Sequence, residues 1–176
     1  MKDSVMVHTN IEIKARSDNH DEIREILSSH SADFKGADHQ IDTYFKTNHG
    51  RLKLREGKLE NFLIHYNREN TGGPKQSDVT LFKSQPETSL KEILTKSLGI
   101  LVVVNKQREI YFIDNVKFHI DMVKGLGSFI EIEAIGTDGN YTEDQLYRQC
   151  RHYLGLFRIP EEDLLPYSYS DMLLKE

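Results

Sequence analysis

The sequence has one cysteine, no long apolar run and fewer basic than acidic residues. Cys150 alone permits neither an internal disulfide nor a cysteine zinc site. No stretch reaches the roughly 18 consecutive apolar residues of a membrane-spanning helix, and the first residues lack the apolar core of a signal peptide. A cytoplasmic protein with no membrane contact is therefore the expectation.

The charge balance argues against a nucleic-acid partner. With 23 Lys and Arg against 28 Asp and Glu, the formal net charge is -5. Such a field repels a phosphate polymer unless a strong local basic patch overrides it. The 176 residues, 38% of them hydrophobic, suffice for one compact core, so we predict a single domain over residues 1–176.

Alternating polar and apolar side chains are the main structural signal. Residues 10–16 place Ile11 and Ile13 on one face of a strand and Glu12 and Lys14 on the other. The same alternation recurs along the chain, and short turns such as 48–50 join successive strands, which favours antiparallel pairing.

About eight strands and three helices follow from these patterns, with loops expected around Gly36 and over residues 70–77, where Lys75 reads as a loop charge. This count predicts an α+β fold: an eight-stranded antiparallel β-barrel, or a strongly curved sheet, with flanking helices. The expected strands are 10–16, 41–45, 51–55, 62–68, 79–83, 101–112, 116–123 and 129–135, and the expected helices are 18–30, 86–98 and 142–155.

Positive side chains gather on single strand faces. Arg51, Lys53 and Arg55 lie at two-residue spacing on one face, where like charges repel. A row of cations is easier to understand if an anion bridges them, although a solvated strand face is the alternative. Further cations that add to this set are Lys14, Arg68, Lys106 and Arg108.

Negative side chains gather on other strands. Glu131 and Glu133 share one face, and His119 and Asp121 share a face of the preceding strand. Two adjacent carboxylates suit a divalent cation, but simple pairing with Lys or Arg across the sheet is the alternative. His119 is more typical of a hydrogen-bonded sheet histidine than of a metal ligand.

In a closed barrel with its charged faces turned inward, the positive and the negative side chains would line the same cavity. A polyanion that carries a hard divalent ion, such as a triphosphate, fits that cavity. Zinc fits poorly because the histidines are scattered and have no thiolate partners.

The residues also resemble the CYTH superfamily of triphosphate tunnel metalloenzymes. Its signature Glu-x-Glu-x-Lys matches Asn10, Glu12 and Lys14, with Asn10 in place of the first Glu. The resemblance continues nearly to the end of the chain and is strongest to the class IV adenylyl-cyclase-like and thiamine-triphosphatase-like branch. It runs through residues 50–56, Arg68, Lys106, Arg108, Asp121, residues 129–133 and residues 167–171.

The resemblance implies an eight-stranded tunnel, a small-molecule triphosphate ligand and Mg²⁺ or Mn²⁺ as cofactor. It implies metal binding by Glu12, Glu131, Glu133 and Asp121, and catalytic roles for Glu12, Lys14 and Glu133. It implies triphosphate binding by Lys14, Lys53, Arg55, Arg68, Lys106 and Arg108.

Three function classes remain open at this point. The first is an enzyme, either a cyclase that converts ATP into cyclic AMP and pyrophosphate or a hydrolase of thiamine triphosphate or tripolyphosphate. The second is a catalytically weak triphosphate-binding protein, which Asn10 favours because its amide brings no charge. The third is an interaction protein that uses the polar sheet as a docking face. The sequence leaves a homodimer open.

Overall fold

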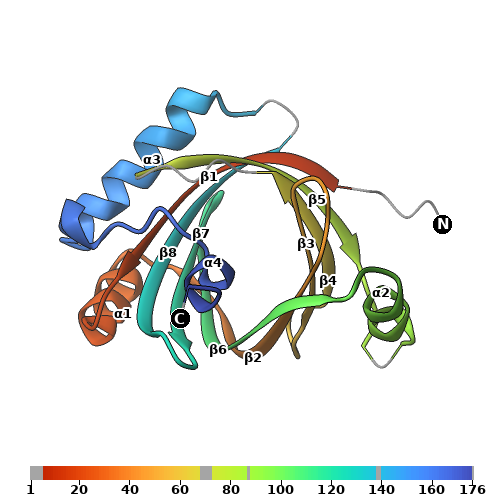
Figure 1. Ribbon diagram of the computed structural model, residues 1–176. Coiled ribbons are helices and arrows are strands. Elements are labelled where there is room, and N and C mark those ends of the chain that lie inside the picture. Colours follow the sequence, from red (N-terminus) through yellow and green to blue (C-terminus); the bar gives the residue numbers. More distant parts are fainter. Residues whose placement is uncertain (1–5, 68–72, 87, 138–139, 176) are drawn as a thin grey trace.

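Eight antiparallel strands form a closed barrel in the computed structural model, which describes residues 6–67, 73–86, 88–137 and 140–175. The order around the barrel is β1-β5-β4-β3-β2-β6-β7-β8, and β8 pairs with β1 to close it (Figure 1). The predicted α+β barrel with flanking helices is therefore confirmed.

The strands are β1 (Met6–Arg16), β2 (Asp33–Phe45), β3 (Arg51–Glu56), β4 (Phe62–Asn67), β5 (Lys75–Lys83), β6 (Ile100–Ile113), β7 (Val116–Val123) and β8 (Gly127–Gly136). The helices are α1 (His20–Ser29), α2 (Leu90–Leu98), α3 (Glu143–Leu156) and α4 (Tyr169–Leu173), with a 3-10 turn, η1, at Glu161–Asp163.

The apolar faces of β1, β7 and β8 point outward and are covered by α1 and α3 (Figure 1). Ile13, Phe118 and Ile132 are buried there together with Leu27 of α1 and Cys150 of α3. Because side chains alternate along a strand, burial of this face against helices turns the polar residues of the same strands into the barrel. The packing that stabilises the fold thereby orients the charged faces.

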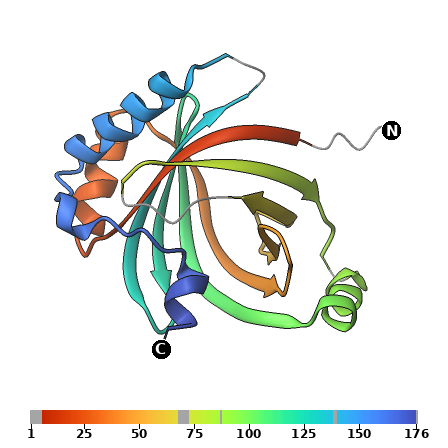
Figure 2. The same cartoon turned by 45° about the horizontal axis from the view of Figure 1, so that its top comes forward.

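The last part of the chain returns to the barrel and covers one of its openings, where α4 sits in both views (Figure 2). Leu164 forms a β-bridge with Ala15, and the Leu165 N–H donates to the Lys14 carbonyl over 2.9 Å. Ser168 caps α4 through a capping box, and Tyr169 is buried. The sequence analysis did not anticipate α4 or η1.

Several expected boundaries are wrong. The loop expected around Gly36 is part of β2, where a register shift between Phe34 and Gly36 absorbs the irregular residue. The φ of Gly36 is 130°, a conformation that favours glycine. Residues 75–77, expected in a loop, begin β5, and the helix expected from Pro86 begins at Leu90.

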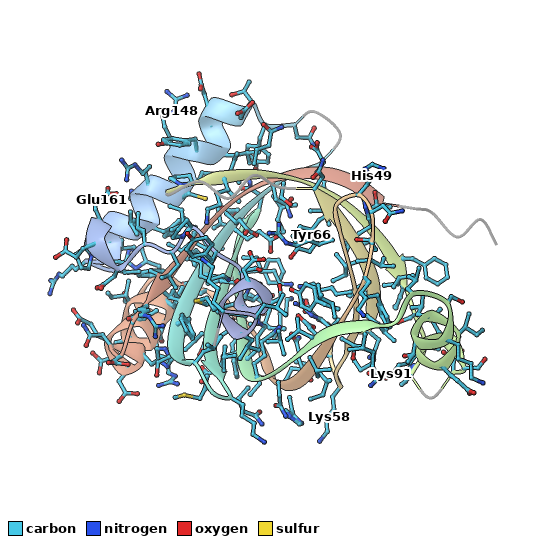
Figure 3. All side chains as sticks on the ribbon, in the orientation of Figure 1. His49, Lys58, Tyr66, Lys91, Arg148 and Glu161 are labelled. Atoms are coloured by element: carbon cyan, nitrogen blue, oxygen red, sulfur yellow. The ribbon has the colours of Figure 1, made fainter. Side chains whose placement is uncertain are left out.

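Charged side chains project from the outer surface of the helices. Figure 3 shows Lys91, Arg148 and Glu161 projecting away from the barrel, whereas Tyr66 lies within the ring of strands. Among the described residues, no helix combines the length and apolar character needed to cross a membrane.

Candidate functional site

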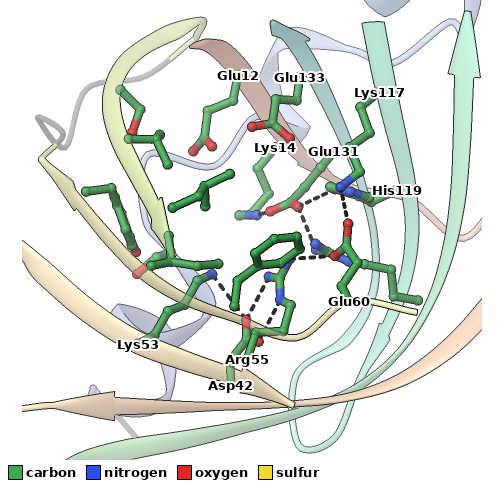
Figure 4. Close-up of a pocket in the computed structure, with 18 of the residues that line it drawn as sticks. Glu12, Lys14, Asp42, Lys53, Arg55, Glu60, Lys117, His119, Glu131 and Glu133 are labelled. Atoms are coloured by element: carbon green, nitrogen blue, oxygen red, sulfur yellow. Dashed lines mark hydrogen bonds and ion pairs between the residues drawn. The ribbon is translucent and has the colours of Figure 1, made fainter. Parts of the chain in front are cut away.

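One cavity of about 340 Å³ lies inside the barrel, and its lining is rich in charge (Figure 4). Side chains from all eight strands reach it. The predicted site residues that line it are Glu12, Lys14, Lys53, Arg55, Lys106, Arg108, Glu131 and Glu133. The prediction that these strands surround one cavity is therefore confirmed, while the roles of the side chains remain predictions.

Asp42 on β2 joins three of the cations. Its Oδ1 accepts from Arg55 Nε at 2.8 Å, and its Oδ2 accepts from Arg55 Nη2 at 2.9 Å. Lys106 Nζ donates to the same Oδ2 over 2.7 Å, and Lys53 Nζ over 3.1 Å. Three positive side chains from β3 and β6 thus converge on one carboxylate, as Figure 4 shows for Lys53, Arg55 and Asp42.

Lys53, Arg55 and Lys106, which we call the cation cluster, repel one another, and the single carboxylate of Asp42 does not cancel this repulsion. Burial lowers the pKa of Lys106 well below its usual value, and the nearby Arg108 lowers it further. Burial alone would raise the pKa of Asp42, but Arg55, Lys106 and Lys53 together hold it well below its ordinary range. An additional anion at this place would relieve the repulsion among the cations.

A second acidic residue, Glu60, approaches the cluster from the turn between β3 and β4. It accepts from Arg55 Nη1 at 2.9 Å and from Gln40 Nε2 at 3.0 Å, and it pairs with Lys117 of β7. Asp38 fixes this turn, since its carboxylate accepts the backbone N–H of Glu60 at 3.3 Å. A side chain at Gly57 would collide with the Asp38 carboxylate, so glycine is required there.

Glu131 is engaged by basic side chains on three sides. It pairs with Lys14, accepts from Arg108 Nη2 at 2.6 Å and accepts from His119 Nδ1 at 3.0 Å. Burial and the neighbouring Arg108 lower the pKa of His119 well below its usual value, so its ring is neutral and Nδ1 carries the donated proton. The structure thus shows Glu131 paired with basic side chains, and its metal-binding role stays a prediction.

Asp121 lies deeper than the cavity lining. Arg108 holds it through two hydrogen bonds, of 2.7 and 2.5 Å, and the Tyr169 hydroxyl of α4 donates to it over 2.7 Å. Its position behind Arg108 suits a residue that orients that guanidinium. The structure does not bring Asp121 together with Glu12 and Glu133 at the cavity surface.

Glu12 and Glu133 fit a divalent ion better than the other two predicted ligands. They are direct neighbours across β1 and β8, and both line the cavity (Figure 4). Asn10 donates its amide to Glu133, and its own Oδ1 has no partner among the described residues. Oxygen donors of this kind suit Mg²⁺, which is held by one or two carboxylates together with substrate phosphates. Within the described part of the chain, no three Asp, Glu, His or Cys side chains form a metal cluster.

Two other residues that the sequence analysis singled out, Arg51 and Lys75, do not line this cavity. Arg51 pairs with Asp171 of α4 over 2.9 Å and does not line this cavity. Arg68 falls outside the described residues. Lys75, expected as a loop charge, is buried on β5, and its Nζ donates to the Leu165 carbonyl over 2.6 Å.

Sequence reasoning missed several residues of the site, among them Asp42, Glu60, Lys117 and Tyr169. Lys117 precedes His119 and Asp121 at two-residue spacing, a signal that could have found it, and Asp42 shares the alternation of β2. Glu60 lies in a turn and Tyr169 on a short helix, where no strand periodicity points to the barrel interior.

The inward direction of these charges argues against two alternatives, a solvated strand face and a sheet face that docks another protein. Arg55 is 7% exposed and Lys106 is 2% exposed, so their strand faces are not solvated. A polar sheet face that points into a closed barrel also offers no flat docking surface to another protein. The interaction-protein hypothesis thereby loses its structural basis.

Replacement of Asp42 by Asn should lower the free energy of unfolding at pH 7 by about 3–5 kcal/mol, because three buried cations lose their shared carboxylate. Since the folded pKa of Asp42 is depressed, its contribution is complete above the unfolded pKa of about 3.9 and declines as pH falls from there. Urea titrations at pH 7 and pH 3 should therefore show a smaller difference at pH 3.

Asp33→Asn is the matched control, because its carboxylate is 61% exposed and pairs with Lys35 on the same strand. It should change the free energy of unfolding by less than about 0.5 kcal/mol at both pH values. An Asp42 variant as stable at pH 7 as this control would show that the carboxylate does not hold the cations.

Comparison with known proteins places the chain in a family. The CYTH domain model matches residues 8–169. A protein of Methanocaldococcus jannaschii named "Putative adenylate cyclase" is 26% identical over 176 residues, which cover 92% of this chain and 97% of that protein.

Solved structures share the fold. A Vibrio parahaemolyticus protein, also titled a "putative adenylate cyclase", has a TM-score of 0.74 at 21% identity and covers 94% of this chain and 97% of its own. A Hippeastrum protein titled a "putative adenylyl cyclase" with "a dominant" triphosphatase activity has a TM-score of 0.62 at 13% identity, with 95% and 94% of the two chains covered. Because the CYTH model matches nearly the whole chain, this protein belongs to the CYTH domain family.

Proposed function

We propose that this protein is a metal-dependent enzyme that acts on a nucleotide or other triphosphate bound in the barrel cavity. Proteins of the CYTH family bind triphosphate substrates and generally use divalent metal ions. The observation that carries the proposal is the convergence of Lys53, Arg55 and Lys106 on Asp42, inside a closed barrel whose wall also holds Glu12 and Glu133.

The proposed role of the cation cluster is to bind and orient phosphate oxygens. Arg55 has a guanidinium suited to two-point contacts with a phosphate, and Lys53 and Lys106 add point charges from either side. Lys117 and Arg108 extend the positive lining along the cavity. Held in a cavity that limits access of water, such preorganised cations stabilise the charge on the phosphoryl oxygens in the transition state more strongly than they would in water.

The proposed metal-binding residues are Glu12 and Glu133. A divalent ion held there would neutralise phosphate oxygens and polarise the reacting phosphorus. Lys14 is paired with Glu131, and its Nζ lies 3.9 Å from the centre of the Tyr169 ring. We infer that Lys14 keeps Glu131 in place beside the reaction site.

The first reaction we propose is class IV adenylyl-cyclase-like: the 3′-hydroxyl of ATP attacks the α-phosphorus, and pyrophosphate leaves with formation of cyclic AMP. The named relatives support it. Triphosphate hydrolysis is the second candidate, in which water attacks the terminal phosphorus, the diphosphate leaves and orthophosphate forms. The fold relative from Hippeastrum supports that one.

The products of one assay distinguish the two reactions from each other and from binding without turnover. Purified protein is incubated with ATP, GTP, thiamine triphosphate or tripolyphosphate, each with Mg²⁺ or Mn²⁺, and cyclic nucleotide, pyrophosphate and orthophosphate are measured. We expect cyclic AMP and pyrophosphate in equal amounts from ATP. Orthophosphate without cyclic nucleotide would favour hydrolysis, and no product with any substrate would contradict an enzymatic function.

Mg²⁺ or Mn²⁺ should stabilise the fold, because Glu12 and Glu133 face one another across β1 and β8 and offer carboxylate oxygens to the same divalent ion. At 100 times its dissociation constant, the ion would add about 2.7 kcal/mol to the free energy of unfolding. Glu133→Gln should reduce this metal-dependent gain in stability and abolish most of the turnover.

The exposed Glu143 on α3 provides the matched control for the metal response, measured as the melting temperature with and without the ion. Glu143→Gln should behave as the wild type does. A Glu133→Gln protein with the full metal response and full turnover would show that this carboxylate does not bind the ion.

A further inference from the structure

One side of the cavity carries no charge. Phe62 and Ile64 of β4 and Val79 and Leu81 of β5 line it with purely apolar side chains. We refer to these four residues as the β4–β5 wall. Ile64 lies directly opposite Leu81 in the pairing of the two strands, so the wall is continuous.

The β4–β5 wall borders the cation cluster directly. In the register of β3 and β4, Arg55 is opposite Phe62 and Lys53 is opposite Ile64. Side chains so paired on one face of a sheet have Cβ atoms about 4.5–5.5 Å apart. A ligand whose phosphates lie on Lys53 and Arg55 would therefore place its attached group against Phe62 and Ile64.

We propose that the β4–β5 wall binds the ring of an organic triphosphate, so that the substrate is a ring-bearing triphosphate and not inorganic tripolyphosphate. This inference rests on the proposed function and adds to it the class of substrate and the residues that select it.

A ligand that is charged throughout fits such a cavity poorly, because part of the cavity wall is apolar. Tripolyphosphate consists of charged oxygens that the cations can bind, but it covers apolar wall surface with groups that prefer water. A planar ring buries itself and the wall together, and a ring can stack on the Phe62 side chain.

The cavity has room for such a group. Its volume of about 340 Å³ lies within the range of roughly 300–1,000 Å³ found for small-molecule sites that combine apolar walls with a few polar groups. Ile64 and Val79 also belong to a hydrophobic cluster with Tyr44 and Tyr169, and all four side chains are buried and line the cavity. The wall is thus a fixed surface of the cavity.

The test compares two ligands that share the phosphate chain. Dissociation constants of ATP and tripolyphosphate are measured by calorimetry in buffer without divalent ions, so that turnover does not interfere. Wild-type protein should bind ATP more tightly, although tripolyphosphate has the greater negative charge. Leu81→Ala should weaken ATP binding about tenfold and leave tripolyphosphate within about twofold, because only the ring contacts this side chain.

Phe82 provides the matched control, since it is the next residue of β5 and is 46% exposed on the outer face. Phe82→Ala should change neither dissociation constant. Phe62→Ala is a second variant in case Leu81→Ala melts at a much lower temperature, and it should shift the two ligands in the same unequal way.

The outcomes separate this inference from the proposed function. Equal weakening of both ligands by Leu81→Ala and Phe62→Ala, or no weakening of either, would overturn the role of the wall while leaving triphosphate binding intact. Tighter binding of tripolyphosphate than of ATP by the wild type would also overturn it. Failure of both ligands to bind the wild-type protein, both in this buffer and with Mg²⁺ added, would contradict the proposed function itself.

Discussion

The contact between Asp42 and its three cations is the interaction on which the rest of the site depends. Arg55 and Lys106 are buried, and each would raise the energy of the empty barrel if no carboxylate compensated it. Asp42 balances only part of the positive charge that lines the cavity. The neighbouring cations hold the pKa of Asp42 low, while burial first and then Arg108 lower the pKa of Lys106. Asp42 thus allows the cations to be buried in the folded barrel, and the remaining positive charge is complementary to an anion.

Barrel closure and helix packing provide the frame for this arrangement. α1 and α3 bury the outer apolar faces of β1, β7 and β8, and this packing directs Lys14, His119 and Glu131 inward. A second hydrophobic cluster, built around Tyr44, Tyr66 and Tyr169, fills the part of the barrel next to α4. The cavity that remains lies between a charged wall and an apolar one, which suits a ligand with both characters.

The sequence predicted the barrel because a strand with one buried face alternates with a period of two, and that period is visible in residues 10–16, 51–55 and 129–135. Alternation also predicted which face Lys53, Arg55 and Glu133 would share. It could not show which partner each charge would meet, since partners come from strand register. Glu131 thus pairs with Lys14, Arg108 and His119, and Arg51 meets Asp171 of a helix with too few residues to show a periodic pattern. Glu60 depends on the shape of a turn that Asp38 fixes through backbone N–H groups.

The central claim, that the cation cluster on Asp42 binds phosphates, is tested most directly at Lys53. This side chain lines the cavity and is 13% exposed, with a contact of 3.1 Å to Asp42, so its loss disturbs the fold less than loss of Arg55 or Lys106 would. Calorimetric titration of tripolyphosphate should show binding to Lys53→Gln weakened by about 1.5–3 kcal/mol, the scale of a hydrogen bond to a charged group. Binding to the exposed-site control Lys58→Gln should be unchanged. Equal affinity of both variants and the wild type would contradict the account.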